Sequence, residues 1–280
     1  MKVAVIGAGT MGHGIAQVSA VAGHEVTLFD ISPDAVEGAL RRIGENLDAA
    51  IALGKLSASE VNLALQRIRT THDLASIAGS HLVIEAAPED LKMKRSIFRA
   101  AEETLTPTAI LATNTSSISI GTLATGLHRP NRFIGLHFFN PPYIIGLVEI
   151  VFGPETEEHT IDEAVSFVQG LGKEPVVVKD SPGFATSRLG VALGLEAMRM
   201  LEEGVADAAS IDRAMELGYR HPMGPLRLTD LVGLDVRLGI SEYLFETLGQ
   251  PHFAPPEILR RLVAEGKLGK KTGEGFYRWE

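Results

Sequence analysis

Short apolar runs alternate with helical patterns along the first 180 residues. The runs are nearly continuous in Val, Ile, Leu and Ala, which is typical of strands covered on both faces. Because helical segments separate them, they predict βαβ units and a mostly parallel, Rossmann-like sheet. The predicted strands span residues 2–7, 25–30, 81–86, 109–114, 132–139, 147–152 and 174–180.

The pattern changes after Pro182. Residues 189–201, LGVALGLEAMRML, are apolar almost all round and lack strand alternation, which favours a helix buried inside a domain or against a partner subunit. Further helix caps and breaks are expected at Asp207, Gly218, Pro225, Gly249 and Gly266. We therefore expect a larger α/β domain over residues 1–182 and a smaller all-α domain over residues 183–280.

One segment does not fit a minimal α/β unit. Residues 34–67 are too long for a single crossover helix, and the stretch from Gly54 to Ser57 interrupts the helical pattern. The segment predicts a helix–turn–helix excursion from the sheet.

Composition and charge narrow the function. The chain has 280 residues, 45% of them hydrophobic, and a formal net charge of −9. An acidic chain of this kind has no general affinity for nucleic acid or an anionic membrane. It has no cysteine, which excludes disulfides, thiolate nucleophiles and Cys-ligated metals, and we expect no metal. Neither a signal peptide nor a long apolar run is found, so we expect a cytoplasmic protein.

A glycine motif opens the chain. Gly7, Gly9 and Gly12 form G-x-G-x-x-G directly after a predicted strand and at the start of a predicted helix. The first glycine permits a tight turn, the second lets a pyrophosphate approach the backbone, and the third lets the helix pack on the strand. The helix N-terminus adds free N–H groups. The alternative is a Gly-rich turn that binds no nucleotide.

Asp30 ends the second predicted strand, 18 residues after Gly12. A carboxylate there accepts hydrogen bonds from ribose hydroxyls and repels a 2′-phosphate. No arginine follows closely in DISPDAV, so the expected cofactor is NAD rather than NADP. His13 also lies in the glycine loop, either as a phosphate contact or incidentally.

His137 and Glu149 are candidates for acid–base chemistry. His137 ends one predicted strand and Glu149 lies inside the next, among Leu, Val and Ile residues. A glutamate in so apolar a strand is costly without a partner. An imidazole exchanges protons near neutral pH, and a carboxylate holds it in one tautomer. We therefore expect the two residues to act as a pair, although a single histidine of this kind is more often structural.

A polar stretch, ATNTSSISI, follows another predicted strand. Asn114, Thr115 and Ser116 lie at its carboxyl end, where open α/β sheets bind ligands. Ser116 could bind the substrate oxygen, and Asn114 the nicotinamide or its ribose. The alternative is a polar turn or helix cap.

A series of ordered motifs extends along essentially the whole chain: VIGAGTMGHGIAQ, VIEAAPEDLKMK, TNTSSISI, GLHFFNPP, LVEIV, KDSPGF, HPMGPLRLTDLVGLD and LGKKTGEGFY. Together they make the chain similar to the L-3-hydroxyacyl-CoA dehydrogenase family. Members of that family oxidise a 3-hydroxyacyl-CoA with NAD to the 3-ketoacyl-CoA and NADH. They are typically dimers joined through the helical domain, so the resemblance implies an acyl-CoA substrate and a homodimer.

The resemblance also implies roles for individual residues. It places the catalytic histidine on His137, the paired glutamate on Glu149, the substrate-binding serine on Ser116, the nicotinamide-side asparagine on Asn114 and the ribose aspartate on Asp30. The other expected cofactor contacts are Gly7, Gly9, Thr10, Met11, Gly12, Ala87, Glu89 and Lys94. The other expected substrate contacts are Asn140, Ser187 and Lys55, the last in the segment that resembles the family's CoA-binding arm. Arg41 and Arg42 are further candidates there, and the alternative for all three basic residues is a solvated helix face.

Two positions depart from the family pattern. Ser187 stands where the family usually has an asparagine that helps to hold the substrate carbonyl, and Gly146 stands where relatives often carry lysine. A hydroxyl is shorter than an amide and has one donor where the amide has two. Both departures bear on the acyl group more than on hydride transfer.

The expected activity is thus reversible oxidation of a (S)-3-hydroxyacyl-CoA, such as 3-hydroxybutyryl-CoA, with NAD. One alternative is oxidation of a free sugar acid, as in relatives of L-gulonate dehydrogenase and lambda-crystallin. Another is a non-catalytic NAD-binding protein, against which the intact Ser116, His137 and Glu149 argue.

Overall fold

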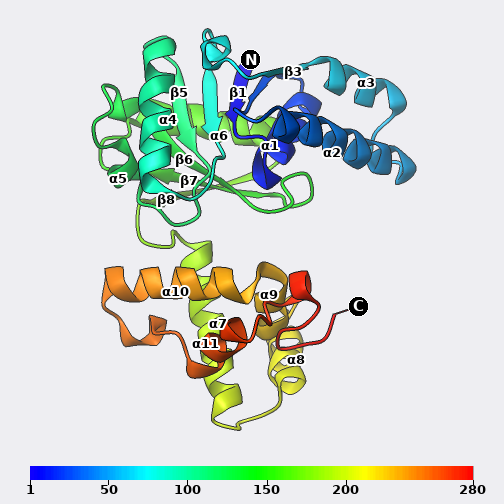
Figure 1. Ribbon diagram of the computed structural model, residues 1–280, viewed down its shortest axis with the longest axis vertical. Coiled ribbons are helices and arrows are strands. Elements are labelled where there is room, and N and C mark those ends of the chain that lie inside the picture. Colours follow the sequence, from blue (N-terminus) through cyan, green and yellow to red (C-terminus); the bar gives the residue numbers. More distant parts are fainter. Residues whose placement is uncertain (280) are drawn as a thin grey trace. The chain divides into compact units, whose positions relative to one another are not determined.

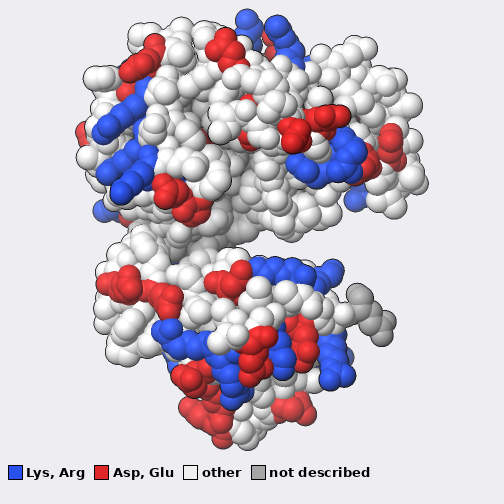
Figure 2. Space-filling model, in the orientation of Figure 1, with Lys and Arg blue, Asp and Glu red and all other residues white. Residues whose placement is uncertain are grey.

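The computed structural model describes residues 1–279 and divides into two compact units (Figure 1). The first unit spans Met1–Asp180 and the second begins at Ser181, two residues before the start of the all-α domain expected from the sequence. Basic side chains lie in small groups beside acidic ones on the face shown in Figure 2. Within residues 1–279, no helix combines the length and apolar character needed to cross a membrane.

One eight-stranded sheet forms the centre of the first unit, in the order β3-β2-β1-β4-β5-β6-β7-β8. Neighbouring strands are parallel except β6 and β7, which are antiparallel, so the predicted mostly parallel Rossmann-like sheet is confirmed. The strands are β1 (Lys2–Ile6), β2 (Glu25–Phe29), β3 (Ile68–Thr71), β4 (Leu82–Glu85), β5 (Ile110–Thr113), β6 (Phe133–Phe138), β7 (Leu147–Phe152) and β8 (Glu174–Lys179).

Helices cover both faces of this sheet, which explains the nearly continuous apolar strands. Val3, Val5 and Ile84 share one core cluster with α1, α2, α3 and α6. On the other face, Phe98 of α4 packs edge-to-face on Phe133 of β6, with ring centroids 4.8 Å apart. The helices are α1 (Thr10–Val21), α2 (Pro33–Ala52), α3 (Ala58–Gln66), α4 (Leu91–Thr104), α5 (Ile120–Ala124) and α6 (Glu158–Gly170), with 3-10 turns η1 (Leu74–Ile77) and η2 (Pro130–Arg132).

The helix–turn–helix excursion is present, and a strand that the sequence pattern did not predict follows it. Ser32 caps α2, and Ser57 with Glu60 forms a capping box that starts α3 after the interruption. The chain then returns to the sheet through β3, whose sequence IRTT has one apolar residue in four. β3 is an edge strand with exposed positions, so it carries no continuous apolar run to detect.

The second unit is helical. Its elements are α7 (Thr186–Glu202), α8 (Ala208–Gly218), α9 (Pro225–Val232), α10 (Leu234–Leu248) and α11 (Glu257–Ala264), with η3 (Pro251–Phe253) and η4 (Lys270–Thr272). Asp207 caps α8 through the N–H of Ser210, and Pro225 opens α9, as the sequence predicted. Residues 189–201 lie in α7, which buries one face within this unit, including Val191, and leaves Leu189 exposed.

Two buried aspartates bind the end of the chain to the helices of this unit. Asp230 of α9 accepts hydrogen bonds from the backbone N–H groups of Phe276 and Tyr277, both at 2.8 Å, and from the Trp279 indole at 2.9 Å. Asp212 of α8 accepts the Tyr277 hydroxyl at 2.7 Å. Burial and the Asp212 carboxylate raise the pKa of Tyr277. These contacts attach the end of the motif LGKKTGEGFY to α8 and α9.

Candidate active site

The strand order reverses between β1 and β4, so the loops that follow these two strands meet at the carboxyl edge of the sheet. Gly7 directly follows β1, with a φ of +104°, and a side chain there would place its Cβ 2.7 Å from the carbonyl oxygen of Ala86. A Cβ on Gly12 would lie 1.7 Å from the carbonyl oxygen of Gly7. Both positions therefore require glycine for the loops to approach each other.

Gly9 is different, because a Cβ there would meet nothing within 4 Å. It is exposed, it precedes the twelve-residue helix α1, and no side chain caps that helix. Thr10 is exposed and Met11 is half-buried in the first turn. Open space in front of uncapped helical N–H groups is the arrangement that a pyrophosphate needs, so the glycine loop fits a dinucleotide.

Asp30 lies immediately after β2, beside this loop. Its carboxylate accepts the backbone N–H groups of Ala8 at 2.8 Å and Ser32 at 2.9 Å, which fixes its orientation. His13 is bonded through Nδ1 to the carbonyl oxygen of Gly9 at 2.9 Å, and burial lowers its pKa. A neutral ring bound to the loop backbone favours the incidental interpretation of His13 over a phosphate contact.

The structure pairs His137 with Glu149. They are direct cross-strand partners in the antiparallel β6–β7 pair, and His137 Nδ1 lies 2.8 Å from Glu149 Oε2. The side chains are 6% and 0% exposed. When Nδ1 donates its proton to the carboxylate, Nε2 becomes the basic nitrogen of the neutral ring. The pair therefore has the geometry of an oriented general base.

The end of β5 is connected to this pair. Asn114 follows β5 and accepts the backbone N–H of Phe138, the residue after His137, through its side-chain oxygen at 2.9 Å. Asn114 is buried, whereas Ser116 is half-buried two residues further along. The loop that carries Ser116 therefore leaves the sheet next to the strand that carries the imidazole.

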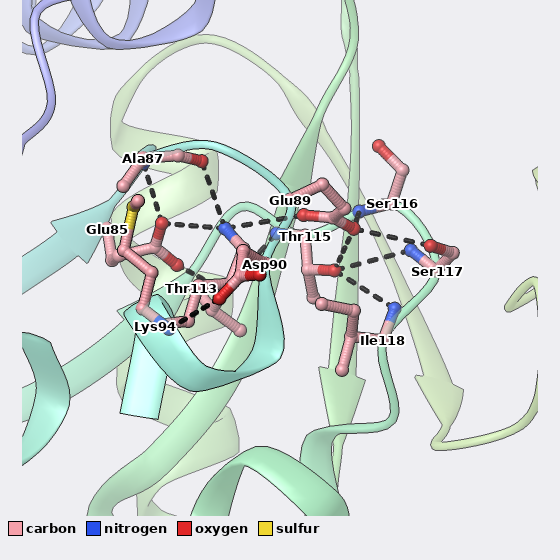
Figure 3. A network of polar contacts seen from close by, with 11 residues as sticks. Glu85, Ala87, Glu89, Asp90, Lys94, Thr113, Thr115, Ser116, Ser117 and Ile118 are labelled. Carbon is pink, nitrogen blue, oxygen red and sulfur yellow. Dashed lines mark hydrogen bonds and ion pairs between the residues drawn. The ribbon is translucent and has the colours of Figure 1, made fainter. Parts of the chain in front are cut away.

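A second buried pair, Glu85 and Lys94, lies at the same edge (Figure 3). Glu85 ends β4 and Lys94 lies in the first turn of α4, with 2.6 Å between the ammonium and the carboxylate. Lys94 also donates to the carbonyl oxygen of Ala87 and forms an ion pair with Glu89. The sequence suggested Ala87, Glu89 and Lys94 as cofactor contacts but missed Glu85. An acid inside the apolar run LVIEA was the available signal, and it is the same signal that identified Glu149.

The remaining predicted residues lie elsewhere. Lys55 is exposed in the turn between α2 and α3, and Asn140 is exposed in the β6–β7 loop, three residues after His137. Ser187 is half-buried in the first turn of α7, in the second unit. Arg41 pairs with Glu45 on the surface of α2, whereas Arg42 donates to the carbonyl oxygen of Ala8 in the glycine loop at 3.1 Å.

Two family models together match nearly the whole chain. The model for the 3-hydroxyacyl-CoA dehydrogenase NAD binding domain matches residues 2–181, and the model for the 3-hydroxyacyl-CoA dehydrogenase C-terminal domain matches residues 183–279. The chain belongs to the 3-hydroxyacyl-CoA dehydrogenase family. It is therefore an NAD-dependent oxidoreductase, and its first unit is the family's NAD-binding domain.

Individual family members are similar over the full chain. A 3-hydroxybutyryl-CoA dehydrogenase of Mycobacterium tuberculosis is 43% identical over 280 residues, covering 99% of this chain and 98% of that protein. The crystal structure of a (S)-3-hydroxybutyryl-CoA dehydrogenase from Ralstonia eutropha is 40% identical, covers 100% of this chain and 99% of that one, and has a TM-score of 0.96. A 3-hydroxyadipyl-CoA dehydrogenase of Escherichia coli is 42% identical over 99% of this chain and 58% of that protein.

Proposed function

We propose that the protein catalyses the reversible oxidation of a (S)-3-hydroxyacyl-CoA to the 3-ketoacyl-CoA with NAD. The observation that carries this proposal is the buried His137–Glu149 pair, at 2.8 Å, at the same edge of the sheet as the glycine loop. Oxidation of an alcohol requires a base for the hydroxyl proton beside a hydride acceptor. This edge of the sheet has the base, His137, and a glycine loop suited to binding a dinucleotide.

His137 takes the hydroxyl proton of the substrate through Nε2. Glu149 holds Nδ1–H and stabilises the imidazolium that forms, the orienting role that an acid has in hydrolase triads. Ser116 donates its hydroxyl to the substrate oxygen, and Asn114 would contact the nicotinamide or its ribose. In reverse, the imidazolium returns the proton to the oxygen. A positioned general base contributes about 10²–10⁴ to the rate.

NAD, when bound, supplies the hydride acceptor for carbon 3 of the acyl group. Gly7, Gly9 and Gly12 give its pyrophosphate access to the N–H groups at the start of α1, with Thr10 and Met11 in the same turn. Asp30 is oriented by Ala8 and Ser32 toward an acceptor role for ribose hydroxyls. A 2′-phosphate would meet the carboxylate as a like charge, which favours NAD over NADP.

The acyl-CoA assignment draws on the named relatives. Two of them are named for 3-hydroxybutyryl-CoA and one for 3-hydroxyadipyl-CoA. All three substrates named are CoA thioesters, which favours an acyl-CoA over a free sugar acid as the substrate of this protein. Their acyl groups are not all the same. Asn140, Ser187 and Lys55 are the proposed substrate contacts, with Lys55 on the nucleotide part of CoA.

A cytoplasmic homodimer is part of the same proposal. The helical unit exposes large apolar side chains, which favour its helices as the dimer contact: Leu189, Val205, Leu217, Tyr219, Leu231 and Phe245. Light scattering after size-exclusion chromatography tests the dimer, and a monomer at micromolar concentration would contradict it.

The decisive experiment follows NADH oxidation with acetoacetyl-CoA and with 3-ketoacyl-CoA thioesters of graded chain length. NADPH in place of NADH, and free acetoacetate in place of the thioester, serve as controls. We expect turnover with NADH and a CoA thioester and much weaker turnover in both controls. Equal rates with free acetoacetate would favour a small acid as the substrate, and no turnover with any thioester would contradict the proposal.

A further inference from the structure

We propose that Glu85 is a positioning residue for the reaction and that it sets the place of Ser116 through Lys94 and Glu89. The inference rests on the proposed role of Ser116 in binding the substrate oxygen. Glu85 is thus assigned a function in turnover, although three successive contacts, through Lys94 and Glu89, separate it from the backbone N–H of Ser116 (Figure 3).

The chain of contacts from Glu85 through Lys94 and Glu89 to Ser116 begins at a fully buried carboxylate. Glu85 is 0% exposed, and three donors meet its two oxygens. Oε1 accepts the Lys94 ammonium and the backbone N–H of Ala87, both at 2.6 Å, and Oε2 accepts the Thr113 hydroxyl at 2.7 Å. Burial raises the pKa of Glu85, while the Lys94 charge and these hydrogen bonds oppose the rise. Because these donors come from the start of α4, the loop after β4 and the end of β5, the carboxylate is held in one position at the edge of the sheet.

Lys94 connects the Glu85 carboxylate to the loop that follows β4. An ammonium has three N–H donors, and here they meet three oxygens. These are Glu85 Oε1 at 2.6 Å, the Ala87 carbonyl at 3.2 Å and Glu89 Oε2 at 3.3 Å. The Lys94 side chain is 1% exposed, so its ammonium depends on this set of partners and has little freedom to turn.

Glu89 is the third member, and it alone of the three is substantially exposed, at 42%. An exposed carboxylate on a loop has many rotamers unless something holds it. Lys94 holds Oε2, which leaves Oε1 facing the loop after β5. Oε1 accepts the Thr115 hydroxyl, the Ser116 backbone N–H at 3.2 Å and the Ser117 hydroxyl at 3.3 Å.

The geometry at Ser116 suits a positioning role. Its backbone nitrogen faces Glu89 while its hydroxyl points away from the carboxylate (Figure 3). The backbone is therefore held from one side, and the hydroxyl remains directed elsewhere. Thr115, itself bonded to Glu89, accepts the N–H groups of Ser117 and Ile118 and so orders the following turn.

Glu85→Gln is the direct test, because it keeps the shape and one carbonyl oxygen but removes the charge that holds Lys94. Displacement of a substrate-binding group by about 1 Å can lower activity about 100-fold. We expect kcat/KM for acetoacetyl-CoA to fall about 10–100-fold, with the affinity for NADH nearly unchanged. The midpoint of thermal unfolding should also fall, because the buried Lys94 keeps only Glu89 as a counter-charge. A wild-type kcat/KM in a folded Glu85→Gln variant would overturn the proposal.

A double-mutant cycle with Ser116→Ala separates positioning from a general structural effect. If Glu85 acts through Ser116, Glu85→Gln should have little further effect once the hydroxyl is gone. Additive losses would overturn the proposal. Glu102→Gln is the matched control, since Glu102 is another buried acid on α4. Its partners are the backbone N–H groups of His128 and Arg129 and the Arg129 guanidinium. This variant should leave turnover near the wild-type value.

Hydrogen exchange gives a readout that does not depend on turnover. The amides of residues 116–118 should lose protection in Glu85→Gln and keep it in Glu102→Gln. If the wild-type protein fails to reduce acetoacetyl-CoA, the proposed function falls and this exchange result alone decides the positioning. If Glu85→Gln does not fold, the double variant Glu85→Gln/Lys94→Met, which removes both buried charges, replaces it. Wild-type protection of amides 116–118 in that double variant would also overturn the proposal.

Discussion

The first unit contains two buried pairs of one acid and one base, and they differ in what the base can do. His137 and Glu149 are 2.8 Å apart, and Lys94 and Glu85 are 2.6 Å apart, with both acids fully buried. An imidazole exchanges a proton near neutral pH, whereas an ammonium keeps its proton there. Similar burial and distance therefore suit the proton transfer proposed for one pair and the positioning proposed for the other.

The two pairs are also built differently. His137 and Glu149 face each other across the antiparallel strands β6 and β7, so backbone register sets their separation. Lys94 reaches Glu85 from the following helix and also contacts the loop between them, through Ala87 and Glu89. A pair on strands is rigid and can hold a reacting group, whereas a pair that links a strand, a loop and a helix fixes the loop.

The largest effect is expected from removing the imidazole. His137→Ala should lower kcat by about 10²–10⁴, because the general base is lost, while NADH affinity stays at the wild-type value. Stopped-flow or steady-state NADH oxidation measures the first quantity and fluorescence titration the second. His159→Ala, on the surface of α6, is the control. Near-normal turnover in His137→Ala would show that this residue is not the general base. The proposed difference in role between the two buried pairs would then be wrong.

Removing the cation of the second pair should also lower stability. Lys94→Met leaves a buried carboxylate without its cation, which should lower the free energy of unfolding by about 3–5 kcal/mol. Chemical denaturation measures this loss, and adding Glu85→Gln should restore much of it. An equal loss in the double variant would show that the pair contributes no electrostatic compensation.

The loss in Lys94→Met should depend on pH. Burial raises the pKa of Glu85 above its ordinary value of 4.5, and the variant lacks the lysine that opposes this. A carboxyl group with a raised pKa in the folded state contributes stability below its ordinary value and loses it as the pH rises. The stability deficit of Lys94→Met relative to wild type should therefore shrink from neutral toward acid pH. A deficit that grows in acid would contradict an ionised, unpaired Glu85.

The sequence predicted the pairing of His137 with Glu149 but missed the pairing of Glu85 with Lys94, and the reason is physical. An acid in a strand of Val, Ile and Leu has a desolvation cost that requires a partner, and His137 lies within one hairpin of Glu149. Glu85 gives the same signal, but it is the last residue of its strand and resembles an ordinary polar residue at a strand terminus. Its partner lies on a helix, and helical phase alone does not tell whether a lysine turns inward.

The same limit explains what the sequence missed in the fold. β1, β2 and β4 were predicted because both of their faces are buried and their runs are apolar. β3 was missed because it is an edge strand with no buried position, so its sequence IRTT has no apolar run to detect. Lys94 was predicted as a cofactor contact, but its donors are directed to Glu85, Ala87 and Glu89, which only the side-chain geometry reveals.

Arg237 is a buried cation outside the two pairs, and it tests whether a buried charge needs an acid partner to be stable in this protein. Arg237 of α10 is 7% exposed, its Nε has no hydrogen-bond partner, and within residues 1–279 no acid forms an ion pair with it. Burial lowers the pKa of Arg237 from 12.5 to about 10. That difference corresponds to about 3 kcal/mol of cost to the folded state while the group is charged.

Arg237→Met should therefore raise the free energy of unfolding by up to about 3 kcal/mol at neutral pH. Because the folded-state pKa lies below the unfolded one, the cost is present below about pH 10 and is relieved as the pH rises through that value. The advantage of the variant should thus shrink in alkali. Arg260→Met, which removes an exposed cation paired with Glu242, is the control. Destabilisation by Arg237→Met would mean that the guanidinium has a compensating partner in the assembled protein.

The smallest effect should come from an exposed pair with the same separation as the catalytic one. Arg41 and Glu45 are 2.8 Å apart on α2, but their side chains are 66% and 59% exposed. Water and salt screen such a pair, so Arg41→Ala should change the free energy of unfolding by no more than about 0.5 kcal/mol. Denaturation at low and high salt measures the change. A loss comparable with that of Lys94→Met would show that separation, rather than burial with a committed set of partners, sets the strength of these pairs.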